Sequence, residues 1–212
     1  MTALPLDPAA GFWSRLAPKY ARAPIRDEGA YRTTLARTRA WLSPDDQVIE
    51  VAGGTGTTAL KLADAVSDYT VTDFAPGMVE IAAGKIAAAG RRNLRAAVAT
   101  AEDLPEAEGP WDAILGFNFL HLAPDVPGTL AALRSRLRPG GLLITKSACL
   151  AGKPHFRVMI GAMRLIGKAP AVTFFSTAGL EAMIRDAGFR IEETGDYPAK
   201  PPSHFVVARR VD

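Results

Sequence analysis

The fold of this chain is decided by one short stretch, Val48-Ile49-Glu50-Val51-Ala52-Gly53-Gly54-Thr55-Gly56-Thr57-Thr58-Ala59. It begins with apolar residues typical of a β-strand, continues with three glycines within four positions, and leads into a helix-compatible segment, 57–66. Glycine lets the backbone turn sharply and lets a ligand lie against it, because no Cβ is in the way. The helix that follows offers free N–H groups and a partial positive charge. The stretch therefore predicts a site for a nucleotide-type cofactor at the end of a first strand.

Two cofactors are compatible with these glycines. The segment 54–59 fits the dinucleotide-binding pattern G-x-G-x-x-G/A, and Asp73 lies near the distance at which an acid binds the ribose in such sites. That pattern alone is a weak indication of an NAD-dependent enzyme, so the choice of cofactor depends on the residues around it.

The stretch also resembles the first motif of the class I S-adenosylmethionine (SAM)-dependent methyltransferases, which reads acid-x-G/A-x-G-x-G. Here the motif is Glu50-x-Ala52-x-Gly54-x-Gly56, with Gly53 inside it. An acid at the end of the strand is expected for a methyltransferase and not for a dinucleotide site. The resemblance is to small-molecule methyltransferases of types 11 and 25, and its motifs recur in the right order along nearly the whole chain.

A second family motif, L-x-P-G-G, is matched by Leu137-Arg138-Pro139-Gly140-Gly141, a turn that leads into a fifth strand at 142–146. A dinucleotide-dependent dehydrogenase has no reason to carry it. Together with Glu50, this turn favours SAM over NAD as the cofactor.

The second strand of the pattern ends at Asp73, whose carboxylate can accept hydrogen bonds from both ribose hydroxyls. An aspartate that only caps the turn before the next helix is the alternative. The run 73–82 resembles the family phrase D-x-S-P-x-M-x-x-x-A, which implies that Phe74 and Met78 flank the adenine. The segment Thr100-Ala101-Glu102-Asp103-Leu104-Pro105 resembles the D-A-E-x-L-P loop that reads the adenine edge. Because Thr100 replaces the first acid, the backbone of Ala101 and Glu102 would serve instead.

A fourth strand, 111–116, matches the family phrase F-D-x-V, and Phe117 and Asn118 follow where relatives carry the residues nearest the methyl group. Asn118 could bind the methionine end of the cofactor or the substrate, and His121 is either a general base or a structural histidine. The resemblance implies cofactor contacts from Tyr20, Glu50, Ala52, Gly53, Gly54, Gly56, Asp73, Phe74, Met78, Ala101, Glu102, Phe117 and Asn118.

Two apolar segments flank this core. Helices are predicted at 9–22 and 26–41, and the aromatic stripe of the first one is either core-facing or a lid over the site. The segment 150–175 is apolar and methionine-rich, so it is a substrate cover, an ordinary core helix, or, through the interleaved cations of 157–168, a contact with a membrane surface.

The alternation of seven strands with helices predicts an α/β, doubly wound, Rossmann-like sheet. The family implies the strand order 3-2-1-4-5-7-6, with strand seven antiparallel. We expect one methyltransferase domain over 1–212, divided into an N-terminal helical lid (1–42), a SAM-binding core (43–149), a substrate-covering insert (150–175) and the C-terminal part of the sheet (176–212).

The composition excludes several other classes of protein. The 212 residues have a net charge of +3 without a basic run, so nucleic-acid binding is not indicated. Cys149 is the only cysteine and the three histidines are scattered, so no metal site is expected. The N-terminus does not resemble a signal peptide and no stretch is long enough to span a membrane, so we expect a cytoplasmic monomer or homodimer without stable membrane insertion.

The function predicted from these patterns is methyl transfer from SAM to a small, partly apolar acceptor through an O, N, S or C nucleophile. Aligning donor and acceptor is the main task of such an enzyme, so a catalytic base is optional. An NAD-dependent oxidoreductase, or a protein that binds SAM without catalysis, are the alternatives.

Overall fold

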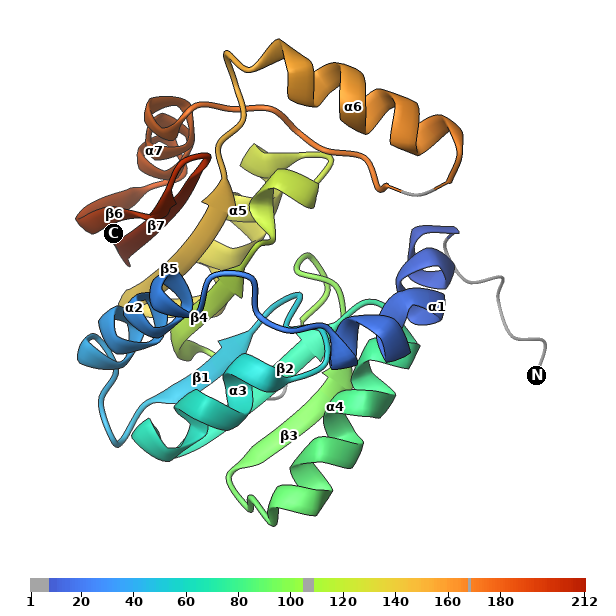
Figure 1. Cartoon of the computed structure of the whole chain (residues 1–212). Coiled ribbons are helices and arrows are strands. Elements are labelled where there is room, and N and C mark those ends of the chain that lie inside the picture. Colours follow the sequence, from blue (N-terminus) through green and yellow to red (C-terminus); the bar gives the residue numbers. More distant parts are fainter. Residues whose placement is uncertain (1–7, 105–108, 168) are drawn as a thin grey trace.

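The computed structural model describes residues 8–104, 109–167 and 169–212, and its centre is a seven-stranded sheet (Figure 1). The strands lie in the order β3-β2-β1-β4-β5-β7-β6, and β7 is antiparallel to both of its neighbours whereas the other pairs are parallel. The strands are β1 Gln47–Glu50, β2 Asp68–Asp73, β3 Leu94–Val98, β4 Trp111–Phe117, β5 Leu137–Ala148, β6 Phe189–Ala199 and β7 Pro202–Arg210. This topology confirms the predicted doubly wound, Rossmann-like sheet.

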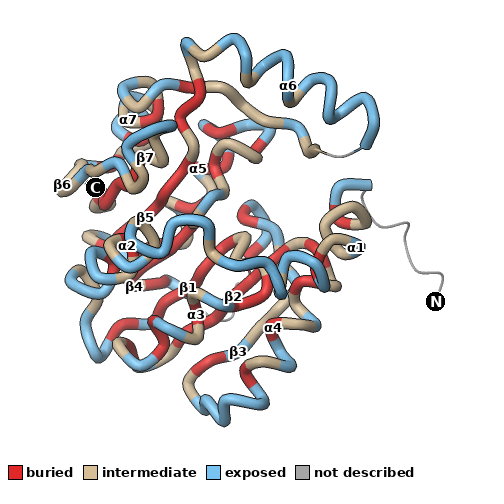
Figure 2. Tube along the Cα trace, in the orientation of Figure 1, coloured by how far each residue is buried: buried red, intermediate tan, exposed pale blue. Residues whose placement is uncertain are grey.

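Helices cover both faces of the sheet. Leu35 of α2, Leu62 of α3 and Ala82 of α4 belong to the core on one face, and Leu130 of α5 and Ile184 of α7 belong to the core on the other. Figure 2 shows the buried residues concentrated along the strands between these layers. The helices are α1 Pro8–Arg22, α2 Glu28–Ala40, α3 Thr57–Leu62, α4 Pro76–Ala89, α5 Val126–Arg136, α6 Pro154–Leu165 and α7 Thr177–Asp186, with short 3₁₀ turns at η1 Ala63–Ala65 and η3 Leu120–Leu122.

Local sequence signals fix several of the helix ends. The side chains of Asp27, Asp125 and Ser176 each accept a hydrogen bond, at 2.8 to 3.0 Å, from the backbone N–H three residues further on, at the starts of α2, α5 and α7. A cap of this kind is worth about 1 kcal/mol. Gly90 adopts a left-handed conformation at the end of α4, as its position in the sequence predicted.

Some boundaries differ from those predicted. The sequence predicts a sixth strand over 188–193, but β6 extends to Ala199, because the antiparallel ladder with β7 continues across two irregularities in register. β5 begins at Leu137, so the predicted turn 137–141 lies within the strand, where Gly140 has a φ of 74°. The helix predicted over 57–66 ends at Leu62 and tightens into η1.

α1 is fastened to the first turn of α4. The backbone N–H of Gly77 donates to Ser14 Oγ at 3.2 Å, and a Cβ at Gly77 would lie 2.9 Å from the Ser14 carbonyl oxygen. Ala10 and Ala17 are the buried residues of α1, whereas Tyr20 is 50% exposed. The aromatic stripe of this helix therefore does not belong to the main core of the sheet.

α2 is joined to the far edge of the sheet. Arg37 donates through Nε and Nη2 to the two carboxylate oxygens of Glu193 on β6, at 2.6 and 2.5 Å, and Trp41 Nε1 donates to the same carboxylate at 2.7 Å. The ring nitrogens of His204 on β7 lie 2.7 Å from Asp196 on β6 and 3.1 Å from Glu181 on α7. These contacts tie the last two strands to helices on both faces.

α6 follows β5 and packs differently from the other long helices. Not one of its twelve residues is buried, so the interpretation of this segment as a core helix is wrong. Figure 1 shows α6 and α1 on the side of the sheet toward which the strands β1, β4 and β5 point. Among the described residues, no helix has the length and apolar character needed to cross a bilayer.

Candidate functional site

The glycine loop turns the chain sharply between β1 and α3. Three of its residues adopt left-handed backbone conformations, with φ of 51° at Ala52, 57° at Gly54 and 72° at Gly56. Such conformations are costly for residues with a Cβ, which accounts for the two glycines and makes Ala52 a strained position. The loop is fixed to β2, because the Gly53 N–H donates to the Thr72 carbonyl at 2.8 Å.

The adjacent glycines Gly53 and Gly54 have different surroundings. A Cβ at Gly53 would lie 2.3 Å from Val71 Cγ2, so this glycine is packed against the sheet. A Cβ at Gly54 would lie 3.7 Å from Tyr20 Cε1 and 4.0 Å from Met78 Sδ, at ordinary contact distances. Gly54 therefore faces a narrow space bordered by α1 and α4, and three of the residues predicted to bind the cofactor meet there.

Asp73 closes the same space at the end of β2. Its Oδ2 accepts from the Gly54 N–H at 3.0 Å, and its Oδ1 accepts from the Ala75 N–H at 2.9 Å. Burial raises the pKa of Asp73, while these two hydrogen bonds act in the opposite direction. The carboxylate thus links the glycine loop to the start of α4, as the capping alternative predicted, and its remaining lone pairs can still accept from two hydroxyls.

Glu50 lies beneath the glycine loop and is almost fully buried. Burial raises the pKa of Glu50 to about 8; the hydrogen bond that it accepts from Tyr69 Oη, at 2.9 Å, opposes this, and the charge of Asp73 adds to it. Burial also raises the pKa of Tyr20, as do the charges of Asp73 and Glu50. The predicted residues Tyr20, Glu50, Gly54 and Asp73 therefore form one cluster of interacting groups.

The segment predicted to read the adenine lies beside β3 and α5. Ala101 is buried, and the Glu102 carboxylate accepts from Thr129 Oγ1 at 2.6 Å, so this side chain is held by α5. Thr100 Oγ1 accepts from the Asp103 N–H at 3.1 Å, which shapes the turn where relatives carry an acid. Pro105, the end of the predicted motif, lies outside the described residues.

The ends of β4 and β5 supply the opposite side of the site. Phe117 is half-buried, and Asn118 is exposed with a left-handed φ of 56° and an N–H that donates to the Lys146 carbonyl at 2.6 Å. Phe74, on the other side near Met78, is half-buried. Asn118 is thus an exposed residue directly after the end of β4.

His121 lies in η3, and its side chain is partly buried. Nδ1 is buried and has no hydrogen-bond partner among the residues that the structure describes. Burial lowers the pKa of His121 to about 4, so the imidazole is neutral at neutral pH and is a weak base. No hydrogen bond links it to Asn118, and its backbone carbonyl accepts from the Thr173 N–H at 2.8 Å.

Two polar residues near the site were not found from the sequence. Tyr31 Oη lies 3.3 Å from Thr58 Oγ1 in α3, which places α2 against the glycine loop. Lys146, near the end of β5, is 7% exposed and donates from Nζ to Thr34 Oγ1 at 3.1 Å; burial lowers its pKa. A lysine within the largely apolar segment 142–148 was the sequence signal that could have indicated a buried lysine with a polar partner.

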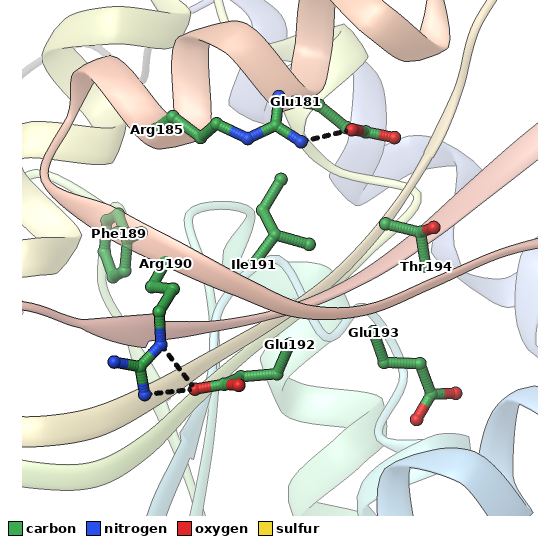
Figure 3. Close-up of a pocket in the computed structure, with 8 residues that line it drawn as sticks. All are labelled: Glu181, Arg185, Phe189, Arg190, Ile191, Glu192, Glu193 and Thr194. Carbon is green, nitrogen blue, oxygen red and sulfur yellow. Dashed lines mark hydrogen bonds and ion pairs between the residues drawn. The ribbon is translucent and has the colours of Figure 1, made fainter.

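A separate hollow lies at the sheet edge, between α7 and β6 (Figure 3). Arg185 pairs with Glu181 and Arg190 pairs with Glu192 along its wall. None of the residues predicted to bind the cofactor lines it, and both of its arginines pair with glutamates of its own wall. We therefore place the functional site at the glycine loop.

A glycine loop at the end of β1, an acid at the end of β2 and this strand order define a Rossmann-like, cofactor-binding α/β fold. Residues 49–143 match the family model described as a methyltransferase domain. This match covers less than half of the chain and, with the solved structures described below, supports the assignment to the class I SAM-dependent methyltransferases. The match supports the choice of SAM over NAD as the cofactor.

Curated relatives share only part of their length with the chain. The demethylmenaquinone methyltransferase of Beutenbergia cavernae is 38% identical over 102 residues, which are 48% of this chain and 40% of that protein. The fumosorinone synthetase of Cordyceps fumosorosea is 30% identical over 159 residues, which are 69% of this chain and 4% of that protein. The chain therefore matches a small part of the much longer synthetase and less than half of the shorter methyltransferase.

Solved structures resemble the whole fold. Magnesium protoporphyrin IX methyltransferase of Synechocystis PCC 6803, with bound S-adenosylhomocysteine, aligns with a TM-score of 0.72 at 18% identity over 97% of this chain and 95% of that chain. The [4+2]-cyclase SpnF aligns with a TM-score of 0.76 at 17% identity over 96% of this chain and 95% of that chain. Because these sequence identities are low, the two alignments show only that the folds are alike.

Proposed function

We propose that the protein transfers the methyl group of SAM to a small, partly apolar acceptor. The observation that carries this proposal is the cluster of Glu50, Gly54 and Asp73 at the carboxyl ends of β1 and β2, with Tyr20 of α1 against it. In a doubly wound sheet this edge is where ligands bind.

In this proposal the chain holds the cofactor at two points. Asp73 accepts hydrogen bonds from the ribose hydroxyls, and the backbone at Gly54 lies against the methionine end, with Tyr20 and Met78 on either side. When bound, SAM supplies an electrophilic methyl group on a sulfonium. The residues of the chain then have to place the acceptor atom in line with that methyl group and keep water away from it.

The acceptor site is proposed to lie between α1 and the segment 150–175. Phe12 and Trp13 of α1 are partly exposed, and Phe156 and Ile160 of α6 are half-buried, so apolar side chains are available on both elements. Residues 1–7 and 168 of the predicted lid and insert lie outside the described residues. The net charge of +3 provides no electrostatic reason for a polyanionic acceptor such as a nucleic acid.

A proton on the acceptor would have to leave during transfer. His121 can accept it as a neutral imidazole, but its pKa of about 4 makes it a poor base. We therefore expect an acceptor that is already nucleophilic at neutral pH, such as an acidic hydroxyl, a thiol or an activated carbon.

Relatives support a small organic acceptor rather than a macromolecular one. One is named for demethylmenaquinone, and others are polyketide synthases. The structural neighbour named as a [4+2]-cyclase gives a reason to keep the alternative, a protein of this fold in which no methyl group is transferred.

The test combines cofactor binding with product formation. Calorimetry should detect SAM and S-adenosylhomocysteine but not NAD, and Asp73→Asn should bind SAM at least about tenfold more weakly, since a hydrogen bond to a charged group is worth roughly 1.5–3 kcal/mol. Asp45→Asn, an exposed aspartate in the turn before β1, is the matched control.

Turnover is then measured as S-adenosylhomocysteine formed with a panel of apolar phenols, hydroquinones, thiols and β-dicarbonyl compounds. Formation with at least one of them supports methyl transfer. SAM binding with no turnover on any acceptor favours the non-catalytic alternative, and stabilisation by NAD but not by S-adenosylhomocysteine would contradict the cofactor assignment.

A further inference from the structure

α6 exposes large aliphatic side chains to solvent. Val158 is 74% exposed, Leu165 is 90% exposed, and Ile166, just after the helix, is 64% exposed. Among the described residues outside 154–166, Tyr20 and Val98 are the other exposed large apolar residues, and both are less exposed than these three. Isolated apolar residues are common on protein surfaces, but several on one helix indicate a contact with a partner.

The apolar residues lie on two sides of α6. Phe156 and Ile160, four residues apart, are half-buried and belong to the side nearer the sheet. Val158 and Leu165, seven residues apart, lie together on a different side, which is the most exposed part of the helix. A substrate enclosed on the half-buried side of α6 would leave this outer side uncovered.

The charge around α6 has a single sign. Residues 126–180 contain eight of the 25 lysines and arginines of the chain and none of its 22 acidic residues. Lys153, Arg157 and Arg164 lie on or directly before α6, and Arg157 packs 4.7 Å from the centre of the Phe174 ring. An exposed apolar side next to cations that have no acidic neighbours in sequence is typical of helices that lie in the interface of an anionic membrane.

Both ends of the α6 segment are fastened to the body of the protein. The Ala151 N–H donates to the Phe175 carbonyl at 3.1 Å, and the Thr173 N–H donates to the His121 carbonyl at 2.8 Å. The helix between them lies on the side of the sheet toward which β1, β4 and β5 point (Figure 1). α6 is thus held in a defined place with its outer side free.

We propose that α6 docks on an anionic lipid surface. Val158, Leu165 and Ile166 enter the boundary between headgroups and acyl chains, and Arg157 and Arg164 lie at the lipid phosphates. A second copy of the chain is a poorer occupant, because two such helices would bring like charges together. The inference does not depend on methyl transfer, since membrane docking is measured without turnover.

Vesicle co-sedimentation tests this docking with the full chain. Vesicles of phosphatidylcholine alone are compared with vesicles containing 30 mol%, about a third, of phosphatidylglycerol, a fraction chosen to resemble an anionic leaflet. We expect binding to the anionic vesicles, weakened by added salt because the Debye length shortens.

Two pairs of variants separate the electrostatic and apolar contributions. Arg157→Glu/Arg164→Glu should weaken binding at least about 25-fold, since each cation near an anionic surface contributes about fivefold. Arg91→Glu/Arg92→Glu changes the charge equally, at exposed residues between α4 and β3, and should have a much smaller effect. Val158→Asn/Leu165→Asn should also weaken binding, and Val98→Asn on β3 is its control.

Several outcomes would overturn the proposal. The proposal is wrong if the chain does not sediment with anionic vesicles, or if it binds both vesicle types equally. It is also wrong if the α6 variants bind like the wild-type chain while circular dichroism shows that they are folded. A concentration-dependent dimer that Val158→Asn/Leu165→Asn dissociates, without vesicle binding, would assign the patch to a second copy instead.

Discussion

Gly53 and Gly54 are neighbours in the chain, yet a side chain would meet a different obstacle at each. At Gly53 the obstacle is Val71 in the sheet, 2.3 Å from the place of a Cβ. At Gly54 the obstacle is the left-handed backbone, and a Cβ would point toward Tyr20, 3.7 Å away. The sequence pattern predicted both glycines as cofactor residues, but only the packing shows that Gly53 is required by the fold, whereas the proposed role of Gly54 is to lie against the ligand.

Substitutions at these two positions should have distinct effects. Gly53→Ala forces a Cβ into the sheet and should cost about 1–3 kcal/mol in the free energy of unfolding. Gly54→Val should lower SAM affinity more than it lowers stability, because its branched side chain fills the ligand space. Urea unfolding and calorimetry on both variants check this; a Gly54→Val protein with unchanged SAM affinity would remove the loop from the site.

Glu50 makes stability depend on pH. Its folded-state pKa, about 8, lies above the unfolded value of 4.5, so the folded state binds the proton more tightly. The stability from this group is fully present below about pH 4.5 and is lost as the pH rises toward about 8. Glu50→Gln should therefore lose less stability than the wild-type chain between pH 5 and pH 8.

Urea unfolding at several pH values, without cofactor, measures this difference. Glu28→Gln, an exposed residue in the first turn of α2, is the control and should follow the wild-type curve. Parallel pH profiles for wild type and Glu50→Gln would show that the buried carboxyl does not hold its proton.

At the scale of elements, the contact between α1 and α4 decides how the site is covered. The starts of α2, α5 and α7 follow from side-chain caps, because Asp27, Asp125 and Ser176 act within one turn. The close approach of Gly77 to Ser14 could not, since it joins residues 63 positions apart. The exposure of α6 could not be predicted either, because an apolar sequence indicates burial whether the partner is the protein or something else.

Two glycines of α4 provide a matched test of that contact. Gly77→Ala places a Cβ against the backbone of Ser14 and should displace α1, which we expect to increase hydrogen exchange across 8–22 and to weaken SAM binding by moving Tyr20. Gly84→Ala meets nothing within 4 Å and should instead stabilise the protein by about 0.5–1 kcal/mol. Equal exchange in the two variants would mean that α1 is not held through Gly77.

At the scale of the whole molecule, the strand order followed from the family motifs, whereas the sequence alone gave only the alternation of strands and helices. The closing part of the sheet was less predictable. The sixth strand was expected to end at 193, before the residues Thr194 to Pro198. Pairing with β7 and the contact between His204 and Asp196 hold them in the ladder instead. Lys146 was missed for a similar reason, since only the fold places it against α2.

His204 should be a main support of this closing hairpin. His204→Ala removes contacts to both Asp196 and Glu181 and should cost about 3–6 kcal/mol in the free energy of unfolding, at roughly 1.5–3 kcal/mol for each hydrogen bond to a charged group. His155→Ala, at an exposed position in α6, should change stability little. A His204→Ala protein as stable as this control would show that the hairpin closes without the histidine.

The contact between Arg37 and Glu193 joins residues 156 positions apart, which constrains the order in which a newly made chain can fold. At roughly 5–20 residues per second, a ribosome needs about 8 to 30 s between adding Arg37 and adding Glu193. During that interval α2 cannot make the carboxylate contacts that fix it to β6, although β1 to β5 have already been synthesised. α2 must therefore wait for β6 to be synthesised before it reaches its final place.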